Sequence, residues 1–182
     1  MVNIGKQPYK PNGDAKDDLN SIERFKNGIL PNIEKYLRGS LLDVGCGNGR
    51  ISNEIKSYFE SIDAIDPAEM PHGDFKDEKI NFIRSDLFSY STEKQYDVIM
   101  LYGVFYLFYQ EGYEKAWAKV DALLSETGSV VIFDNQKRKI STDHFKGHYN
   151  LDRLCGTNFS IVEEFVQEQN IHRISVIRRT HE

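Results

Sequence analysis

The residues with the clearest chemical meaning lie in one glycine-rich stretch, which reads Asp43-Val44-Gly45-Cys46-Gly47-Asn48-Gly49-Arg50. An apolar run ends at the acidic residue, three glycines follow at alternate positions, and a periodic apolar pattern begins at Ile51. We therefore expect a buried strand, a tight turn and the start of a helix. Glycine accepts positive φ and lets backbone N–H groups approach a ligand without an intervening Cβ. A nucleotide-like molecule is expected to lie across this turn.

The spacing of the glycines indicates which class of nucleotide the turn could bind. The dinucleotide fingerprint G-x-G-x-x-G needs a glycine where this chain has Arg50, and the Gly-Lys-Ser/Thr of a phosphate-binding loop is absent. The remaining pattern, Asp43-x-Gly45-x-Gly47-x-Gly49, resembles the first motif of class I S-adenosylmethionine (SAM)-dependent methyltransferases. In that family the turn lies beneath the methionine part of the cofactor. A strand–helix turn without a ligand is the alternative interpretation.

Two further acidic residues follow predicted strands. The strand at 61–66 ends in Asp66, whose carboxylate can accept hydrogen bonds from both hydroxyls of a ribose. The strand at 80–84 runs into Ser85-Asp86-Leu87. Here the resemblance implies an acidic residue that accepts from the adenine amino group, beside a backbone N–H that serves a ring nitrogen. The alternative for Asp66 is an exposed loop aspartate. The alternative for Asp86 is a turn or helix-capping aspartate.

The resemblance implies SAM as the cofactor and S-adenosylhomocysteine (SAH) as the product. The expected cofactor-binding residues come from the glycine turn and from the ends of the following strands: Asp43, Gly45, Cys46, Gly47, Gly49, Asp66, Pro67, Ser85, Asp86, Leu87 and Leu101. Met70 is available to cover the adenine face. No metal site is expected.

The elements that position these residues alternate along the chain. Strands are expected at 41–45, 61–66, 80–84, 96–101 and 129–134, and helices at 51–59 and 113–124, the latter closed by Gly128. Two final strand-like runs, 159–167 and 171–178, are so close in sequence that they can pair only as an antiparallel hairpin. The expected fold is α/β, a doubly wound, Rossmann-like, mostly parallel seven-stranded sheet closed by a C-terminal antiparallel hairpin.

The length of 182 residues suits one domain. We expect a single methyltransferase domain over 1–182, with an N-terminal arm and helices over 1–38 and the SAM-binding α/β core over 39–182. Within the leading part, Phe25 and Ile29 belong to one apolar helical stripe, and Pro31 suits the first turn of a second short helix.

Methyl transfer from a sulfonium is an in-line displacement, so the main task of the enzyme is to hold the acceptor about 3 Å from the methyl group. A base is needed only if the acceptor keeps its proton at neutral pH. The candidates near the carboxyl ends of the strands are Tyr102, Tyr106, His144, His72 and His148, and a structural role is the alternative for each. The histidine pair that many relatives carry after the fourth strand is absent from this chain.

The charge of the chain and its distribution indicate what kind of acceptor the protein could bind. The chain has 23 Lys and Arg against 28 Asp and Glu, a formal net charge of −5, which argues against general attraction to nucleic acids or membrane surfaces. Against this acidic background a basic loop follows the fifth predicted strand, with Lys137, Arg138, Lys139, His144, Lys146 and His148. We expect this loop to receive a negatively charged group of a small-molecule acceptor. A solvated basic loop is the alternative.

No apolar run approaches the roughly 20 residues of a membrane span, and the N-terminus lacks the apolar core of a signal peptide. The two cysteines, Cys46 and Cys155, suit reduced thiols in a cytoplasm. The sequence therefore favours a cytoplasmic SAM-dependent methyltransferase that acts on a small molecule, as a monomer or homodimer and without a nucleic-acid or membrane partner. A non-catalytic SAM- or SAH-binding protein and a protein or RNA methyltransferase stay open as alternatives.

Overall fold

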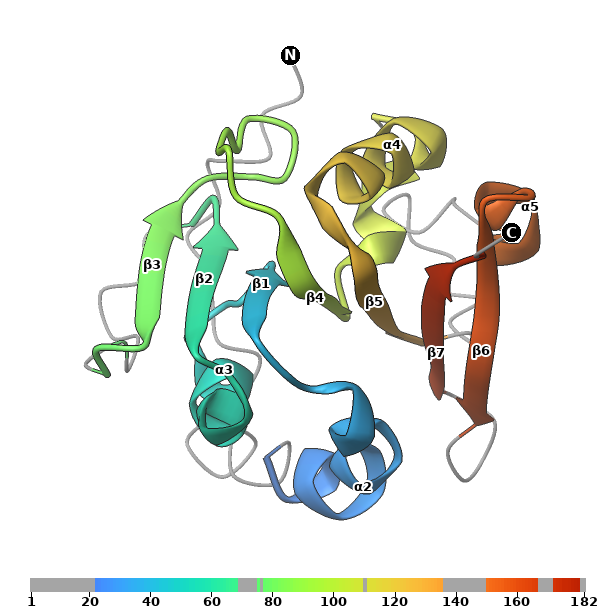
Figure 1. Ribbon diagram of the computed structural model, residues 1–182. Helices are drawn as coiled ribbons and strands as arrows, with labels where there is room; N and C mark the ends of the chain where they lie inside the picture. The colour runs from blue at the N-terminus through green and yellow to red at the C-terminus, as the bar shows by residue number, and fades with distance from the viewer. Residues whose placement is uncertain are drawn as a thin grey trace, which may run out of the picture.

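A seven-stranded sheet in the order β3-β2-β1-β4-β5-β7-β6 forms the centre of the molecule (Figure 1). The computed structural model describes residues 22–68, 75, 77–109, 111–135, 150–166 and 172–180. The strands are β1 (Ser40–Val44), β2 (Ser61–Asp66), β3 (Ile80–Arg84), β4 (Tyr96–Tyr102), β5 (Leu124–Asn135), β6 (Phe159–Val166) and β7 (His172–Arg179). Strands β1 to β5 pair in parallel, and β7 runs antiparallel between β5 and β6. The predicted fold class and C-terminal hairpin are confirmed.

Helical segments cover both faces of the sheet. On one face lie the π-helical turn η2 (Phe25–Ile29), α2 (Leu30–Ile33), the 3₁₀ turn η3 (Glu34–Tyr36), and α3 (Arg50–Ile55) with its 3₁₀ continuation η4 (Lys56–Tyr58). On the other face lie η5 (Phe105–Tyr109), α4 (Tyr113–Leu123) and α5 (Leu151–Cys155). The predicted helix at 51–59 is therefore present, with a tighter final turn.

The leading helical segment changes its winding at η2 because of Pro31. Proline has no N–H, and its ring would crowd the carbonyl of the residue four positions earlier in a regular α-helix. In the wider π turn the N–H of Leu30 reaches the carbonyl of Phe25, and Pro31 then lies in the first turn of α2, as predicted. Phe25 and Ile29 are buried against the sheet.

The helix predicted over 113–124 is present as α4, but its predicted closure by Gly128 is wrong. The helix stops at Leu123, and Gly128 lies inside β5 rather than at a helix terminus. The chain becomes extended at Leu124, with φ −83° and ψ 131°, and the N–H of Leu124 still caps the helix by donating to the carbonyls of Asp121 and Val120. A Cβ at Gly128 would come within 2.7 Å of the Leu124 side chain. The glycine thus permits close packing at the start of the strand.

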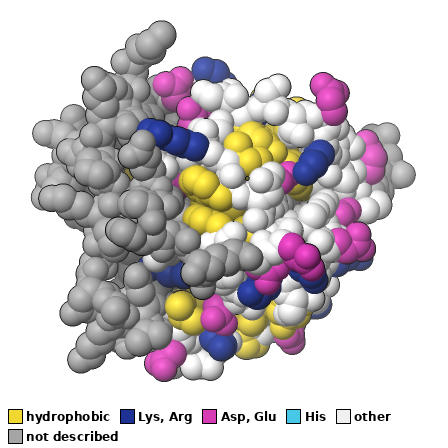
Figure 2. All heavy atoms as spheres, turned by 90° about the vertical axis from the view of Figure 1, so that its left-hand side faces the viewer, with side chains coloured by type: hydrophobic (Ala, Val, Ile, Leu, Met, Phe, Trp, Pro, Cys, Tyr) yellow, Lys and Arg dark blue, Asp and Glu magenta, His cyan; other side chains and the backbone are white. Residues whose placement is uncertain are grey.

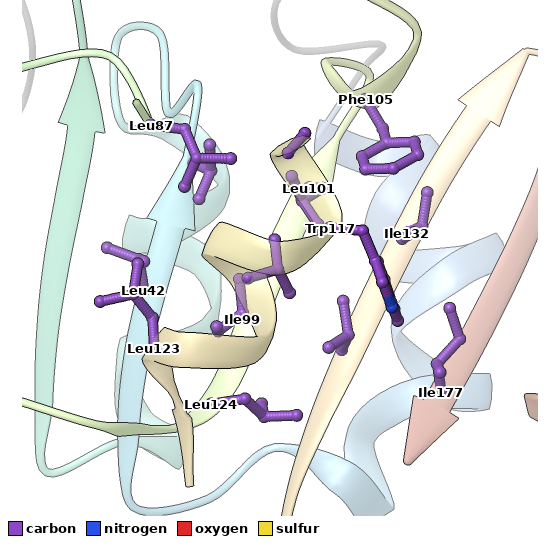
Figure 3. Close-up of a cluster of buried hydrophobic side chains, with 14 of the residues drawn as sticks. Leu42, Leu87, Ile99, Leu101, Phe105, Trp117, Leu123, Leu124, Ile132 and Ile177 are labelled. Carbon is purple, nitrogen blue, oxygen red and sulfur yellow. The ribbon is translucent and has the colours of Figure 1, made fainter. Parts of the chain in front are cut away.

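Each face of the sheet carries its own apolar core. On the α4 side, Leu42, Leu101 and Ile132 from three strands pack with Trp117 of α4 and Phe105 of η5 (Figure 3). On the other side, alternate residues of the same strands pack against α3 and the leading helices. Because these strands pair in parallel, the carboxyl ends of β1, β2, β4 and β5 lie at one edge of the sheet.

The outer surface is mixed in character. Figure 2 shows acidic and basic side chains interspersed with small apolar patches over the described part of the face that includes the β3 side of the molecule. Within the described ranges no helix combines the length and the apolar character that a membrane crossing needs.

A buried polar network lies between β2, β3 and the turns at 85–95 that join β3 to β4. Asp63 of β2, 4% exposed, accepts hydrogen bonds from Tyr96 Oη at 2.6 Å and from Asn81 Nδ2 and Lys94 Nζ at 2.8 Å each. The Tyr90 and Tyr96 hydroxyls also lie 2.6 Å apart. Burial raises the pKa of Asp63, but the hydrogen bonds and the Lys94 charge outweigh burial and hold this pKa below its usual range.

We expect Asp63→Asn to lower the free energy of unfolding at pH 7 by about 1.5–3 kcal/mol, the range for hydrogen bonds to a charged group. The pKa of Asp63 is lower in the folded than in the unfolded state. Its stabilisation is therefore present above about pH 4 and is lost as the pH falls through the folded-state value. Urea unfolding at pH 7 and at pH 3 should show the difference between wild type and variant shrinking.

Asp77→Asn is the matched control, because Asp77 also accepts from a lysine, Lys56, at 2.8 Å but on the surface. Surface ion pairs contribute little to stability. Equal losses of stability in the two variants would contradict the role given to the Asp63 network.

Candidate functional site

The glycine-rich turn joins the carboxyl end of β1 to the start of α3. Gly45, Gly47 and Gly49 all have positive φ, at 71°, 56° and 77°, the conformation for which glycine is favoured. The N–H groups of Gly45 and Cys46 donate to the carbonyl of Ile65 in β2, at 2.8 and 3.1 Å. The turn is thereby tied to the end of the neighbouring strand.

Two side chains from distant segments pack directly on this turn. A Cβ at Gly45 would come within 2.7 Å of Val104, which follows β4, and a Cβ at Gly49 would come within 2.4 Å of the Phe75 ring. Phe75 in turn stacks on Phe82 of β3, with ring centroids 4.6 Å apart. Sequence reasoning missed Val104 and Phe75, because their contacts with the turn depend on the tertiary fold.

Asp43 lies behind the turn, near the end of β1. It is 2% exposed and accepts a hydrogen bond of 2.5 Å from Ser52 Oγ of α3. Burial raises the pKa of Asp43 to about 6; the Ser52 hydrogen bond lowers it, and the charge of Asp66 raises it further. The carboxylate therefore joins β1 to the first turns of α3.

Asp66 stands at the edge of the sheet, at the end of β2. One carboxylate oxygen accepts from the N–H of Gly47 at 3.1 Å, and the other accepts from the N–H of Ala68 at 2.9 Å. Each carboxylate oxygen has two lone pairs, so both can accept a further hydrogen bond. The backbone N–H of Ser85 donates to the Asp66 carbonyl at 3.1 Å, which brings the turn after β3 next to Asp66.

Asp86 folds back into its own turn. Its Oδ1 accepts from the N–H groups of Phe88 and Ser89 at 2.8 and 2.9 Å, and its Oδ2 accepts from Ser89 Oγ at 2.8 Å. This geometry matches the turn-capping alternative, and the adenine contact of Asp86 stays a prediction. The side chains of Leu87 and Leu101 lie in the core (Figure 3), at 1% and 0% exposed.

Cys46 and Pro67 flank the edge formed by these turns. The Cys46 thiol is buried, and burial raises its pKa, so it stays neutral. Pro67 follows Asp66 directly, and its carbonyl accepts from Arg84 Nε at 3.4 Å. In the described part of the chain, no group of three or more His, Cys, Asp and Glu side chains is arranged to hold a metal ion.

Tyr102, a catalytic candidate, is packed into the aromatic core at the end of β4. Its ring stacks on Phe133 with centroids 4.3 Å apart and meets Phe25 edge-on at 5.8 Å. Burial raises the pKa of Tyr102, and the nearby charges of Arg50 and Arg24 offset only part of this increase. The hydroxyl is therefore protonated at neutral pH and unsuited to act as a base.

Of the other catalytic candidates, Tyr106 is the one that lies among the described residues. Tyr106 is partly buried in η5, where its carbonyl accepts from the Tyr113 hydroxyl at 3.3 Å. Several predicted contributors lie outside the described residues: His72, His144, His148, Met70, and Lys137, Arg138, Lys139 and Lys146 of the basic loop.

We expect the charge of Asp43 to reduce stability as the pH rises. Because its pKa is about 6 in the folded state against an ordinary value of 3.8, the protonated form stabilises the fold below about pH 4, and this contribution is lost as the pH rises through 6. Between pH 4 and pH 7, the free energy of unfolding of Asp43→Asn should therefore rise by on the order of 3 kcal/mol relative to that of wild type.

Urea unfolding across this pH range measures the effect. Asp63→Asn is the comparison, because its stability relative to wild type should change with pH in the opposite direction. Parallel stability curves for Asp43→Asn and wild type would contradict the burial effect.

The family model described as a methyltransferase domain matches residues 41–128, which span the glycine turn, β1 to β4, α4 and the start of β5. A search of curated proteins found no match.

Several solved structures share the fold. N-methyltransferase NodS from Bradyrhizobium japonicum WM9 is 17% identical, with a TM-score of 0.72, covering 91% of this chain and 99% of that chain. The 1,6-didemethyltoxoflavin-N1-methyltransferase of Burkholderia thailandensis, solved with 1,6-didemethyltoxoflavin and SAH, is 17% identical, with a TM-score of 0.67, covering 96% and 94%. A second NodS structure contains SAH, with 16% identity, a TM-score of 0.66, and coverage of 92% and 87%. The resemblance stated from the glycine motif is confirmed: the methyltransferase-domain model matches residues 41–128, and the chain has the fold of class I SAM-dependent methyltransferases.

Proposed function

We propose that this protein transfers the methyl group of SAM to a small-molecule acceptor that carries negative charge. The contact that carries the proposal is the hydrogen bond from the Gly47 N–H to the Asp66 carboxylate. The turn is expected to lie beneath the methionine part of SAM, and the Asp66 carboxylate is expected to hold the ribose. The hydrogen bond joins these two groups. Two solved structures with this fold contain SAH, which supports the same cofactor here.

In this proposal the cofactor lies along the carboxyl edge of β1, β2 and β3. The ribose hydroxyls donate to the two Asp66 oxygens, each of which has a lone pair to spare. The adenine lies against Pro67 and the turn that begins at Ser85, since the Ser85 N–H is bonded to the Asp66 carbonyl. Arg50 and Arg24, whose charges act on the Tyr102 hydroxyl, supply positive potential for the carboxylate of the methionine part.

The reaction forms a bond from the acceptor atom to the methyl carbon as the bond from that carbon to sulfur breaks. The sulfonium becomes the neutral thioether of SAH, and any proton on the acceptor is released. Val104 packs over Gly45 and provides an apolar wall beside the methionine part. Since Tyr102 is stacked and protonated, catalysis rests on alignment of the acceptor. Tyr106 and His144 are the candidates for a base when the acceptor requires one.

The negative charge of the acceptor is inferred from the basic loop that follows β5. The strand ends at Asn135, and the N–H of Gly103 donates to the carbonyl of Phe133 at 2.7 Å, which ties the end of β5 to the turn after β4. The end of β5, which Lys137, Arg138, Lys139 and Lys146 follow in the sequence, therefore lies beside the proposed site of methyl transfer. We further propose that residues 1–182 act as one methyltransferase domain in the cytoplasm.

The proposal is tested by calorimetry and by labelled SAM. SAM and SAH should bind with micromolar affinity, and NAD and ATP should give no heat. Label from SAM should pass into components of a metabolite extract that anion-exchange chromatography retains. Binding without any labelled product would instead identify a non-catalytic SAM- or SAH-binding protein, and label in neutral components alone would overturn the anionic acceptor.

We expect Asp66→Ala to weaken SAH binding by about 2–3 kcal/mol, because two hydrogen bonds to a charged group are lost. The fold should survive, since Asp66 lies at the edge of the sheet. Calorimetry with SAH measures the change. Asp77→Ala, which removes a surface carboxylate, is the control. Wild-type affinity in a folded Asp66→Ala protein would show that the ribose assignment is wrong.

A further inference from the structure

A cavity of about 500 Å³ lies between α5, β6 and β7, and the proposed cofactor path does not use it. It is lined by Asn150, Leu151, Asp152, Ile161, Glu164 and Arg173. Figure 1 shows α5 beside β6 on the hairpin side of the sheet.

The strand register places this cavity at the same edge of the sheet as the glycine turn. Tyr102, the last residue of β4, pairs with Phe133 of β5, and Arg173 of β7 pairs with the next β5 residue, Asp134. Arg173 is therefore level with the carboxyl ends of β4 and β5. Two strand spacings of about 4.8 Å separate β7 from β4, so the cavity begins about 10 Å from the turn that carries Val104.

Arg173 presents hydrogen-bond donors to the cavity. Its Nε lies 3.1 Å from Glu164 Oε1, an ion-pair contact that orients the guanidinium. The Nε atom is buried without a hydrogen bond of good geometry. Among the described residues, no acceptor is hydrogen-bonded to the terminal nitrogens of Arg173 either. A planar guanidinium with unused donors matches the two oxygens of a carboxylate or phosphate.

The polar groups that line the cavity beside Arg173 are Asn150, Asp152 and Glu164. Asn150 uses its side-chain oxygen to cap α5, accepting from the Arg153 N–H at 3.1 Å, so the amide –NH₂ is the part that can serve a ligand. Glu164 is engaged with Arg173 and lies 3.4 Å from Ser175 Oγ. Asp152 is the one lining carboxylate without an ion pair in the described ranges, and its exposure to water weakens its repulsion of an anion.

We propose that Arg173, oriented by Glu164, binds an oxyanion at the far end of the methyl acceptor. The acceptor then spans from the turn at Val104 to this cavity, with its carboxylate or phosphate about 10 Å from the atom that is methylated. This inference rests on the proposed methyl transfer and specifies the class of acceptor further.

The test uses the full chain saturated with SAH, so that the cofactor site is blocked. Inorganic phosphate and acetate are titrated at constant ionic strength while the Arg173 Nε–H signal and the amide signals of residues 150–152 are followed by NMR. In wild type these signals should move saturably. Arg173→Gln should raise the dissociation constant at least fivefold, and Asp152→Asn should lower it.

Arg153→Gln is the matched control, because Arg153 lies on α5 but outside the cavity and its side chain is 81% exposed. It should leave the dissociation constant within twofold of wild type. Arg173→Lys, which keeps the charge without the planar fork, should bind less tightly than wild type and more tightly than Arg173→Gln. A response to phosphate alone assigns a phosphate group, and a response to acetate assigns a carboxylate.

Absence of saturable shifts in wild type, or equal shifts of the 150–152 amide signals in wild type and Arg173→Gln, would overturn the oxyanion site. SAH binding is measured first on the same samples by calorimetry. SAH binding without an anion effect contradicts the Arg173 site alone, whereas failure to bind SAH contradicts the proposed methyl transfer.

Discussion

The site depends on the hydrogen bonds that tie the glycine turn to the end of β2. Two turn N–H groups donate to the Ile65 carbonyl, and the Gly47 N–H donates to the Asp66 carboxylate. These bonds require a turn with three residues at positive φ, which only glycine adopts without strain. Val104 and Phe75 then pack where side chains at Gly45 and Gly49 would otherwise lie. The carboxyl ends of β1 and β2, Val104 after β4 and the Phe75 side chain are assembled around this one constraint.

Two aspartates on neighbouring strands show how surroundings set the cost of buried charge. Asp63 has several donors and a lysine, so its pKa falls despite burial, and its charge supports the fold. Asp43 has the Ser52 hydroxyl as its hydrogen-bond donor and feels the charge of Asp66, so its pKa rises. A buried carboxylate kept at such a cost beside the glycine turn is typical of functional sites.

The hairpin carries a cavity near the edge where the parallel strands end. Because β7 is antiparallel to β5, residues near its start, such as Arg173, reach the edge where the parallel strands end. The β6 residues near Glu164 reach the same edge, since β6 runs parallel to β5. An acceptor that lies across these strands would contact both the proposed methyl-transfer site and the hairpin cavity. The geometry thus links an open pocket to the chemistry proposed at the glycine turn.

The sequence by itself determined the glycine turn, the seven strands and the position of Asp66 at a strand end. These features are local, since turn conformation and apolar periodicity depend on residues that are close in the chain. The sequence pattern predicted the start of the fifth strand at 129 instead of Leu124 and assigned Gly128 to a helix terminus, because the extended conformation at Leu124 comes from its place in the sheet. Only the tertiary structure decided that Tyr102 stacks on Phe133 and that Arg173 faces a cavity. Side-chain direction and strand register set these contacts, and both arise from packing between segments far apart in sequence.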